Sequence, residues 1–397
     1  MPITPFTRQQ LLPQEEKLEV MKQRGELFIG LAKETSFQER RICLTPDAVS
    51  SLVAHGHRVM MESGAGQTAS YSDKEYSDAG AEITHDPKKV FGCPIILKVE
   101  PPTLKEIEMM NPETLLISAL QLKTQKADFF KALQGKKITA LAFEYIKDTD
   151  GSYPAVKSLS EIAGTASILI AAELMISQKL GKGLLFGNIT GVPPTEVVII
   201  GAGTAAEFAA KTALGLGASV KVFDNSINRL RRLQNNLNQR IFTSTIQEKA
   251  LLKSLMRCDV AIGAMRGKDR SPVIVSETMV ERMKRGAVVI DISIDTGGCF
   301  ETSEITTHEK PTFVKHNVTH YCVPNIPSRY SKTASLSISN IISPFLLQMA
   351  DDGGIESAMR CDEGLKNGIY MYHGRLTNRS VGEWFDIDST DINLIIF

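Results

Sequence analysis

The sequence predicts an α/β protein of two doubly wound units, each a mostly parallel sheet covered by helices on both faces. Two observations support this fold class. Short runs rich in β-branched and aliphatic residues alternate with helical segments between residues 27 and 146, and the same alternation returns between residues 196 and 325. Strands separated by helices indicate consecutive βαβ units. One long apolar segment, residues 158–181, lies between the two series, so we expect a single helix to join two domains.

The first series begins with an expected strand at residues 27–30. A helix follows in which Thr45 is the cap and Pro46 is the first residue. Further strands are expected at residues 58–62, 94–99, 114–122 and 138–146, with short helices such as 72–80 between them. One of these strands ends in the segment ILKVEPP, whose two prolines stop the run.

The long apolar segment is expected to form one helix buried between two layers or two domains. Ser158 and Glu161 have the spacing of a capping box, and Gly181 would end the helix. The second series has expected strands at residues 196–200, 219–224, 259–265, 287–292 and 319–325. From Thr333 onward the chain is predicted to be helical at first and then less regular.

The composition excludes several classes of partner. Lys and Arg together number 45, as do Asp and Glu, so no strong field attracts nucleic acid or anionic lipid. The longest apolar stretch, Ala166–Ile176, is too short to span a bilayer and contains Glu173, so no membrane insertion is expected. The N-terminus has no secretory pattern, and the six cysteines never have C-x-x-C spacing. We therefore expect a cytoplasmic protein with free thiols and predict no metal site.

The segment EVVIIGAGTAAEFAAKTALGLGASVKVFD predicts a nucleotide site. A strand leads into G-x-G-x-x-A: Gly201 permits a tight turn, Gly203 lets the backbone approach a pyrophosphate, and Ala206 allows close packing of helix on strand. The helix N-terminus offers N–H groups to the phosphates. Asp224 ends the next strand, where a carboxylate accepts from the ribose hydroxyls and repels a 2′-phosphate. The expected cofactor is NAD, held by a Rossmann-like domain.

Eight segments occur in order between residues 26 and 353: KETSFQERRICLTP, ESGAGQTASYSDKEYSDAGAEI, ILKVEPP, SEIAG, GVPPTEVVIIGAGTAA, AVVIDISIDTGGCFET, PTFVKHNVTHYCVPNIPS and KTAS. Together they resemble the superfamily of alanine dehydrogenases and pyridine nucleotide transhydrogenase α-subunits. The segments IDTGGCFET and HYCVPNIP resemble alanine dehydrogenases more closely. The residues before 26 and after 353 have no strong counterpart in this resemblance.

The resemblance implies a discontinuous substrate domain of residues 1–157 plus 331–397, an NAD-binding Rossmann-like domain of residues 158–330, and an active site in the cleft between them. It implies a homo-oligomer that interconverts an amino acid, L-alanine in the type reaction, with a small 2-oxo acid and ammonia while hydride passes to NAD. By resemblance, Arg41 binds the substrate carboxylate. Asp295 lies at the nicotinamide ribose and the reacting groups.

Ser160 and Asn325 fall by resemblance on positions near the cofactor. Lys98 matches the first of two lysines that alanine dehydrogenases carry in this strand. The second lysine, which contacts the substrate oxygen, is replaced by Glu100, and the catalytic histidine of the following strand is replaced by Gln121. Glutamine cannot exchange a proton near neutral pH. Glutamate repels a carboxylate, but it can act as a base or bind an ammonium group.

Three functions remain open at this point. The first is an NAD-dependent amino-acid dehydrogenase of the alanine dehydrogenase type, with divergent acid/base residues. The second is a transhydrogenase α-like NAD(H) component, since hydride transfer between nucleotides needs no lysine–histidine pair. The third is a non-catalytic NAD-binding protein. Lys123 could substitute in part for the missing groups. Arg266, Lys268 and Arg270 form a basic loop that is either solvated or reaches the cofactor phosphates.

Overall fold

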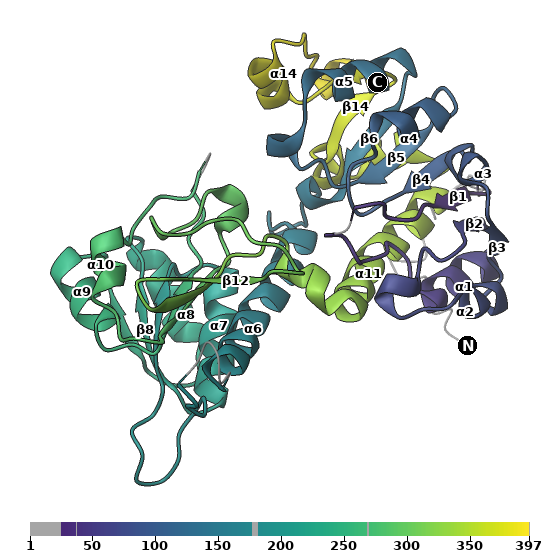
Figure 1. Ribbon diagram of the computed structural model, residues 1–397. Helices are drawn as coiled ribbons and strands as arrows, with labels where there is room; N and C mark the ends of the chain where they lie inside the picture. Colours follow the sequence, from purple (N-terminus) through teal and green to yellow (C-terminus); the bar gives the residue numbers. More distant parts are fainter. Residues whose placement is uncertain (1–24, 37, 177–181, 268–269, 397) are drawn as a thin grey trace, which may run out of the picture.

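The computed structural model describes residues 25–36, 38–176, 182–267 and 270–396, without the side chain of Lys123. Figure 1 shows two α/β halves joined by helices that run between them. One half contains a sheet of eight strands and the other a sheet of seven. The predicted fold class, two mostly parallel sheets with helices on their faces, is therefore confirmed.

The eight-stranded sheet has the order β15-β14-β6-β5-β4-β1-β2-β3. The six strands from β6 to β3 pair in parallel, and β14 and β15 extend the sheet in antiparallel fashion. The strands are β1 Phe28–Leu31, β2 Arg58–Glu62, β3 Glu82–Thr84, β4 Ile95–Leu97, β5 Leu115–Ser118, β6 Thr139–Ala142, β14 Ile369–Tyr372 and β15 Arg375–Leu376. Two apolar cores lie on opposite faces of this sheet, because side chains alternate along each strand.

The helices of this half are short and start at recognisable caps. Thr45 precedes Pro46 as expected, although the Thr45 hydroxyl contacts Ser339 rather than the helix backbone. Ser72 and Glu75 form a full capping box, as do Thr103 and Glu106. The helices are α1 Pro46–Ala54, α2 Asp73–Asp78, α3 Pro87–Phe91, α4 Leu104–Met109, α5 Ala127–Gly135, α12 Ile355–Cys361, α13 Glu363–Lys366 and α14 Arg379–Phe385.

The seven-stranded sheet has the order β12-β13-β11-β10-β7-β8-β9 and is parallel except for β12. Its strands are β7 Glu196–Ile200, β8 Ser219–Phe223, β9 Phe242–Ser244, β10 Val260–Gly263, β11 Val288–Asp291, β12 Thr312–Lys315 and β13 Val318–Tyr321. Its helices are α7 Thr204–Gly215, α8 Ile227–Asn236, α9 Glu248–Leu255 and α10 Glu277–Glu281. The four central strands are almost fully buried, as expected for a sheet covered on both faces.

Two long helices, α6 Pro154–Ile176 and α11 Ser331–Asp351, join the halves and pack on each other. Among the described residues α6 is long and apolar enough to span a membrane, but it packs against α7, α11 and the turn η6 Ile326–Tyr330. The predicted capping box is wrong, because the helix starts at Pro154 and Ser158 and Glu161 lie inside it. The predicted end at Gly181 lies outside the described residues.

Several predicted strands end earlier than expected, among them β4, β5, β6 and β13. Strand β4 ends at Leu97, so Lys98 and Glu100 follow the strand rather than lying in it. Strand β5 ends at Ser118, and the chain then turns through a left-handed residue, Gln121 (φ 46°), into a 3₁₀ turn over Leu122–Thr124. Both segments remain at the carboxyl edge of the sheet, which is where parallel α/β sheets bind ligands.

Gly164 allows α6 to lie directly on α7, because a Cβ atom there would overlap the carbonyl oxygen of Ala205. We expect Gly164→Ala to lower the free energy of unfolding by about 1–3 kcal/mol through overpacking. Gly215→Ala, at the end of α7 where a Cβ meets no atom within 4 Å, is the matched control and should be neutral or slightly stabilising. Denaturant unfolding followed by circular dichroism measures both. An unchanged midpoint for Gly164→Ala would show that the two helices can separate at no cost.

Candidate functional site

The carboxyl edge of the eight-stranded sheet gathers polar and ionisable side chains from the segments that follow four adjacent strands. Glu34 follows β1, Lys98 and Glu100 follow β4, and Gln121 follows β5. Glu144 follows β6 in the 3₁₀ turn Phe143–Tyr145. Strand order β6-β5-β4-β1 makes these segments neighbours in space. The structure therefore brings three of the predicted residues, Lys98, Glu100 and Gln121, to one edge.

Arg41 is buried and paired with a carboxylate that sequence reasoning did not single out. Its Nε donates to Glu39 Oε1 at 2.7 Å, and its Nη2 donates to Glu39 Oε2 at 2.5 Å. Both side chains are nearly inaccessible. Burial by itself would raise the pKa of Glu39, but the charge and hydrogen bonds of Arg41 outweigh burial and leave that pKa lowered. The pair is thus ionised at neutral pH.

Lys98 is also compensated by carboxylates. Its Nζ donates to Glu106 Oε1 at 2.9 Å and lies 3.7 Å from Glu34 Oε2, and its side chain is 1 % exposed. Glu34 accepts from the backbone N–H of Val99 at 2.6 Å, which ties the segment after β1 to the segment after β4. Burial raises the pKa of Glu34 to about 8, although the charge of Lys98 opposes this shift. Lys98 is therefore held in place by protein groups.

Glu100 is half-buried between these two pairs. Burial and the neighbouring charge of Glu39 raise its pKa, while a hydrogen bond with Ser36 and the charges of Lys98 and Arg41 oppose the shift. A carboxyl group whose pKa moves toward neutrality is suited to proton transfer. The structure thus places a titratable group beside the predicted substrate cation.

Gln121 stands on a turn fixed by a second unforeseen carboxylate, Glu144. Glu144 Oε1 accepts from the N–H groups of Leu120 at 2.7 Å and Gln121 at 3.2 Å. Its Oε2 is buried with no hydrogen-bond partner among the described residues, and burial raises its pKa. The opposing charge acting on Glu144 includes that of Arg266, from the loop after β10. Glu144 thus holds the turn that presents Gln121.

The predicted cofactor turn has the geometry that a pyrophosphate requires. Gly201 has φ 110°, and a Cβ there would overlap the carbonyl of Ala264, so only glycine fits. A Cβ at Gly203 would enter open space, and Ala206 is fully buried at the start of α7. These features leave room for a phosphate at the N-terminus of α7. The residues present therefore fit a dinucleotide.

Asp224, directly after β8, is 3 % exposed. Its Oδ2 accepts from the N–H of Ala202 at 2.8 Å and its Oδ1 from the N–H of Ser226 at 2.7 Å. The carboxylate therefore braces the glycine turn at the carboxyl edge of the seven-stranded sheet. Remaining lone pairs on its two oxygens are available to ribose hydroxyls.

Asp295 lies in the 3₁₀ turn Ile294–Thr296 after β11 and is exposed between two buried neighbours. Asp291, at the end of β11, holds this loop by accepting from the N–H of Cys299 at 2.8 Å and the hydroxyl of Ser303 at 2.7 Å. Ser160 lies half-buried in α6. The predicted residues on this side of the cleft therefore come from separate elements.

Asn325 is the predicted cofactor residue that reaches the substrate side. It has φ 56°, in the left-handed region where asparagine is favoured, and its Nδ2 donates to Glu39 Oε2 at 3.0 Å. Since Glu39 also holds Arg41, one carboxylate joins a predicted cofactor residue to the predicted substrate cation. Glu34, Glu39 and Glu144 could have been suspected from the sequence, because each lies close to a segment already selected.

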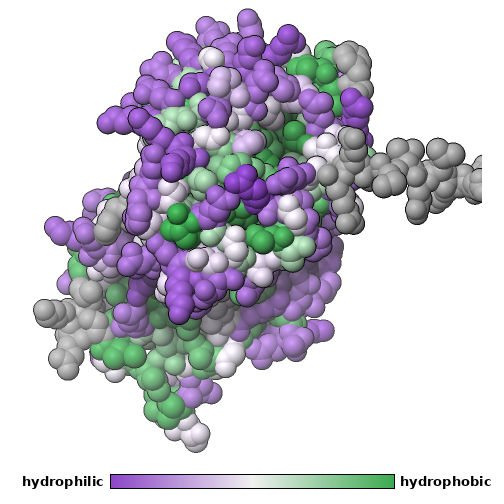
Figure 2. Space-filling view, turned by 90° about the vertical axis from the view of Figure 1, so that its right-hand side faces the viewer, coloured by the Kyte–Doolittle hydropathy of each residue, from purple (hydrophilic) through white to green (hydrophobic). Residues whose placement is uncertain are grey.

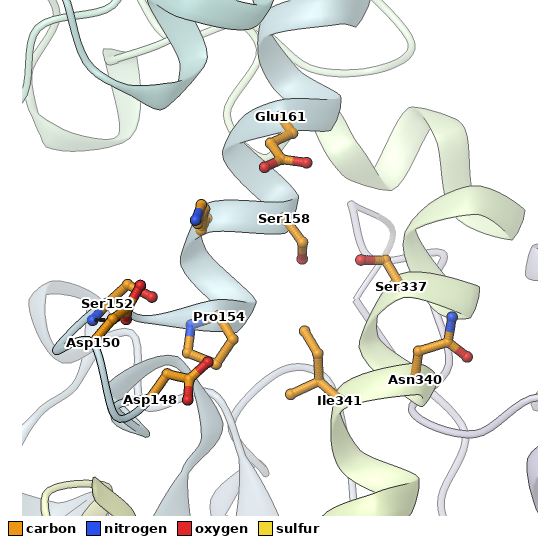
Figure 3. Close-up of a pocket in the computed structure, with 10 residues that line it drawn as sticks. Asp148, Asp150, Ser152, Pro154, Ser158, Glu161, Ser337, Asn340 and Ile341 are labelled. Atoms are coloured by element: carbon orange, nitrogen blue, oxygen red, sulfur yellow. Dashed lines mark hydrogen bonds between the residues drawn. The ribbon is translucent and has the colours of Figure 1, made fainter. Parts of the chain in front are cut away.

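A separate cavity of about 330 Å³ opens between α6 and α11. Figure 3 shows Ser158 and Glu161 of α6 on one side and Ser337 and Ile341 of α11 pointing toward α6 from the other. The predicted site residues do not line it. Among the described residues, no group of three or more His, Cys, Asp or Glu side chains is placed to hold a metal ion. Lys268 and the side chain of Lys123 lie outside the described residues.

Comparison with known proteins gives a consistent result. The N-terminal domain model of alanine dehydrogenase/PNT matches residues 30–163, and the C-terminal domain model matches residues 167–379. An alanine dehydrogenase of Mycolicibacterium smegmatis is 36% identical over 92% of this chain and 98% of its own. Alanine dehydrogenase 2 of Staphylococcus aureus is 36% identical over 91% and 97%. The match to residue 379 extends beyond the expected limit at residue 353.

Two solved structures of related proteins have a fold similar to that of this chain. An L-alanine dehydrogenase superposes with a TM-score of 0.85 at 32% identity, covering 91% of this chain and 99% of its own. A transhydrogenase from Sinorhizobium meliloti superposes with a TM-score of 0.74 at 23% identity, covering 89% and 99%, which shows a shared fold.

Asp224→Ala should weaken NADH binding by roughly tenfold, the cost of losing a charge-assisted hydrogen bond, and should reduce the preference for NADH over NADPH. Calorimetric titration of the variant with each nucleotide measures both effects. Asp128→Ala, an exposed position on α5, is the control and should bind as the parent does. Unchanged affinity of Asp224→Ala for both nucleotides would place the ribose elsewhere.

Proposed function

Because the chain belongs to the alanine dehydrogenase/PNT family, whose members use NAD(H), we propose that it is an NAD-dependent amino-acid dehydrogenase of the alanine dehydrogenase type. It would convert an L-amino acid such as L-alanine to a small 2-oxo acid and ammonia. One observation carries the proposal: the buried Arg41 and the half-buried Glu100 lie at the carboxyl edge of the first sheet, where Glu39 accepts a hydrogen bond from Asn325 in the loop after β13.

Arg41 would bind the substrate carboxylate. A guanidinium has five N–H donors, and Glu39 occupies one on Nε and one on Nη2, so three remain for a carboxylate. Because Glu39 fixes the plane of the guanidinium, the remaining donors point in a defined direction. Substrate binding would then orient the reacting carbon toward the cofactor side of the cleft.

Glu100 would move the proton at the substrate nitrogen or oxygen. Its raised pKa suits this role, and Gln121 beside it could hold the same substrate atom by a hydrogen bond without exchanging a proton. Lys98, fixed by Glu106, would lower the energy of the ionised form of Glu100. NAD, when bound, supplies the hydride acceptor, and Asp295 and Ser160 would contact it.

Two alternatives have support of their own. The departures at Glu100 and Gln121 favour a transhydrogenase α-like NAD(H) component, because hydride transfer between nucleotides needs no acid–base pair. The compensated state of Arg41 and Lys98 favours a non-catalytic NAD-binding protein, because neither cation lacks a partner. The three functions share one fold and differ in the ligands that the site would contact.

We further propose that the substrate domain comprises residues 1–157 plus 331–397 and the NAD domain residues 158–330, with α6 and α11 near the two boundaries. A cytoplasmic location is supported by the six unpaired cysteines, five of them buried. A reducing compartment keeps such thiols intact.

Turnover tests the proposed reaction. The protein should oxidise NADH in the presence of pyruvate and ammonia, and Glu100→Gln should lower kcat by about 10²–10⁴-fold and remove the limb of the pH–rate profile that Glu100 sets. Glu108→Gln, elsewhere in the same half, is the matched control. NADH binding without turnover on any small 2-oxo acid would exclude the dehydrogenase. Hydride transfer from NADH to a nicotinamide analogue would instead support the transhydrogenase-like function.

We also propose a homo-oligomer, supported by apolar residues on a projecting arm. Leu184, Leu185, Ile189 and Val192 are all more than 40% exposed. They belong to the loop at the bottom of Figure 1, and Figure 2 shows apolar surface at the same end of the molecule. Single exposed apolar residues are common, but four in one arm favour an interface.

Leu185→Glu with Val192→Glu should therefore reduce the mass measured by light scattering, because charges would be buried in the interface. Ile227→Glu, an equally exposed position on α8, should leave the mass unchanged. A monomeric parent protein, or a double variant of unchanged mass, would contradict this surface.

A further inference from the structure

Glu39 occupies a position where two distant parts of the chain meet. Its Oε1 accepts from the N–H groups of Arg40 at 3.1 Å and Arg41 at 2.9 Å, besides Arg41 Nε. Its Oε2 accepts from Arg41 Nη2 and, across 286 residues of sequence, from Asn325 Nδ2 at 3.0 Å. The side chain is fully inaccessible. One carboxylate is thus shared between the segment after β1 and the loop after β13.

The backbone around Glu39 is attached to the same loop. The N–H of Arg40 donates to Ser328 Oγ at 2.9 Å, and Ser328 Oγ donates in turn to the carbonyl oxygen of Gln38 at 2.8 Å. The N–H of His308 lies 3.3 Å from Gln38 Oε1. Residues 38–40 are therefore attached to Asn325 and Ser328 by several hydrogen bonds.

A buried carboxylate tolerates little change in its partners. If Asn325 moved toward a bound nucleotide, Glu39 would lose a donor that water cannot replace at an inaccessible site. The guanidinium of Arg41 is bound to both carboxylate oxygens of Glu39, so it would have to move together with Glu39. Arg41 has no other carboxylate at salt-bridge distance among the described residues.

We propose that Glu39 is a positioning residue that couples the cofactor site to the substrate site: a nucleotide that engages Asn325 sets, through Glu39, the orientation in which Arg41 receives a carboxylate. This inference rests on the proposed function, because it takes Asn325 and Arg41 as the groups on the two sides. By linkage the effect is reciprocal, so a bound carboxylate tightens nucleotide binding by the same factor.

The coupling factor is measured with oxamate, a non-reacting carboxylate of the size of pyruvate. Calorimetry gives the Kd of oxamate with and without saturating NADH, and the Kd of NADH with and without saturating oxamate. In the parent protein the two ratios should be equal and of the order of tenfold, within the range usual for coupled sites. In Glu39→Gln, which keeps the shape but removes the charge and one acceptor, the factor should fall to about one to twofold.

Two further variants complete the test. Asn325→Ala removes the link but keeps the Glu39–Arg41 pair, so it should abolish the coupling factor while oxamate still binds alone. Glu62→Gln changes a carboxylate whose hydrogen-bond partner among the described residues is the N–H of Lys33, and it should leave the factor unchanged. Thermal melts show whether each variant is folded.

A merely structural role predicts a different result. Glu39→Gln would then lower the melting temperature and weaken both ligands, with the same coupling factor as the parent. That result, or a parent factor of one, or failure of the parent to bind oxamate, overturns the inference. If the two ligands are coupled but the protein never oxidises NADH, the proposed dehydrogenase function is rejected and the coupling role of Glu39 is kept. If the protein turns over substrate but the coupling factor is one, the function is kept and the coupling role of Glu39 is rejected.

Discussion

The packing of α6 on α7 is the constraint on which the arrangement of the two halves depends. Gly164 lets the two helix backbones touch, and small residues continue along this contact. The same helix packs against α11 and the turn Ile326–Tyr330. Because α7 begins at the glycine turn, the position of the cofactor turn relative to the first sheet follows from one helix–helix contact. A larger residue at 164 would therefore displace the glycine turn at the start of α7 as well as the helix.

In the predicted substrate site, each buried cation is paired with a buried carboxylate. Arg41 and Lys98 are each held by a carboxylate at salt-bridge distance, and burial raises the pKa of the half-buried Glu100 near both of them. Breaking a buried pair leaves an uncompensated charge, so each cation is fixed in direction. In the proposed function, a substrate carboxylate would therefore meet donors whose geometry is set before it arrives.

Sequence reasoning succeeded where the determinants are local. The turn at Gly201 and Gly203 and the acid at Asp224 are specified by neighbours within one βαβ unit, and their positions are as predicted. It failed where the residue that fixes the local structure lies far away in sequence, or where a familiar local pattern indicated a different start for a helix. Ser158 and Glu161 have capping-box spacing, yet Pro154 starts the helix one turn earlier.

Sequence reasoning also missed the carboxylates that form hydrogen bonds with the predicted site residues, and this was the larger omission. Glu39 acquires its importance from Asn325, 286 residues away in sequence. Glu144 was assigned to the middle of a strand, whereas β6 ends two residues before it. The roles of Arg41, Glu100, Gln121, Asp295 and Ser160 remain predictions, because they depend on bound substrate and cofactor.

The antiparallel strands β14 and β15 are synthesised long after β6, the strand whose edge they extend. Strand β14 pairs with β6, but Ile369 is synthesised 227 residues after Ala142 (369 − 142), which corresponds to a delay of about 10–45 s at ordinary elongation rates. During this interval β6 is an open edge, and the nucleotide-binding half can fold first. Until β14 emerges, the unpaired edge of β6 is a strand edge to which other chains can pair.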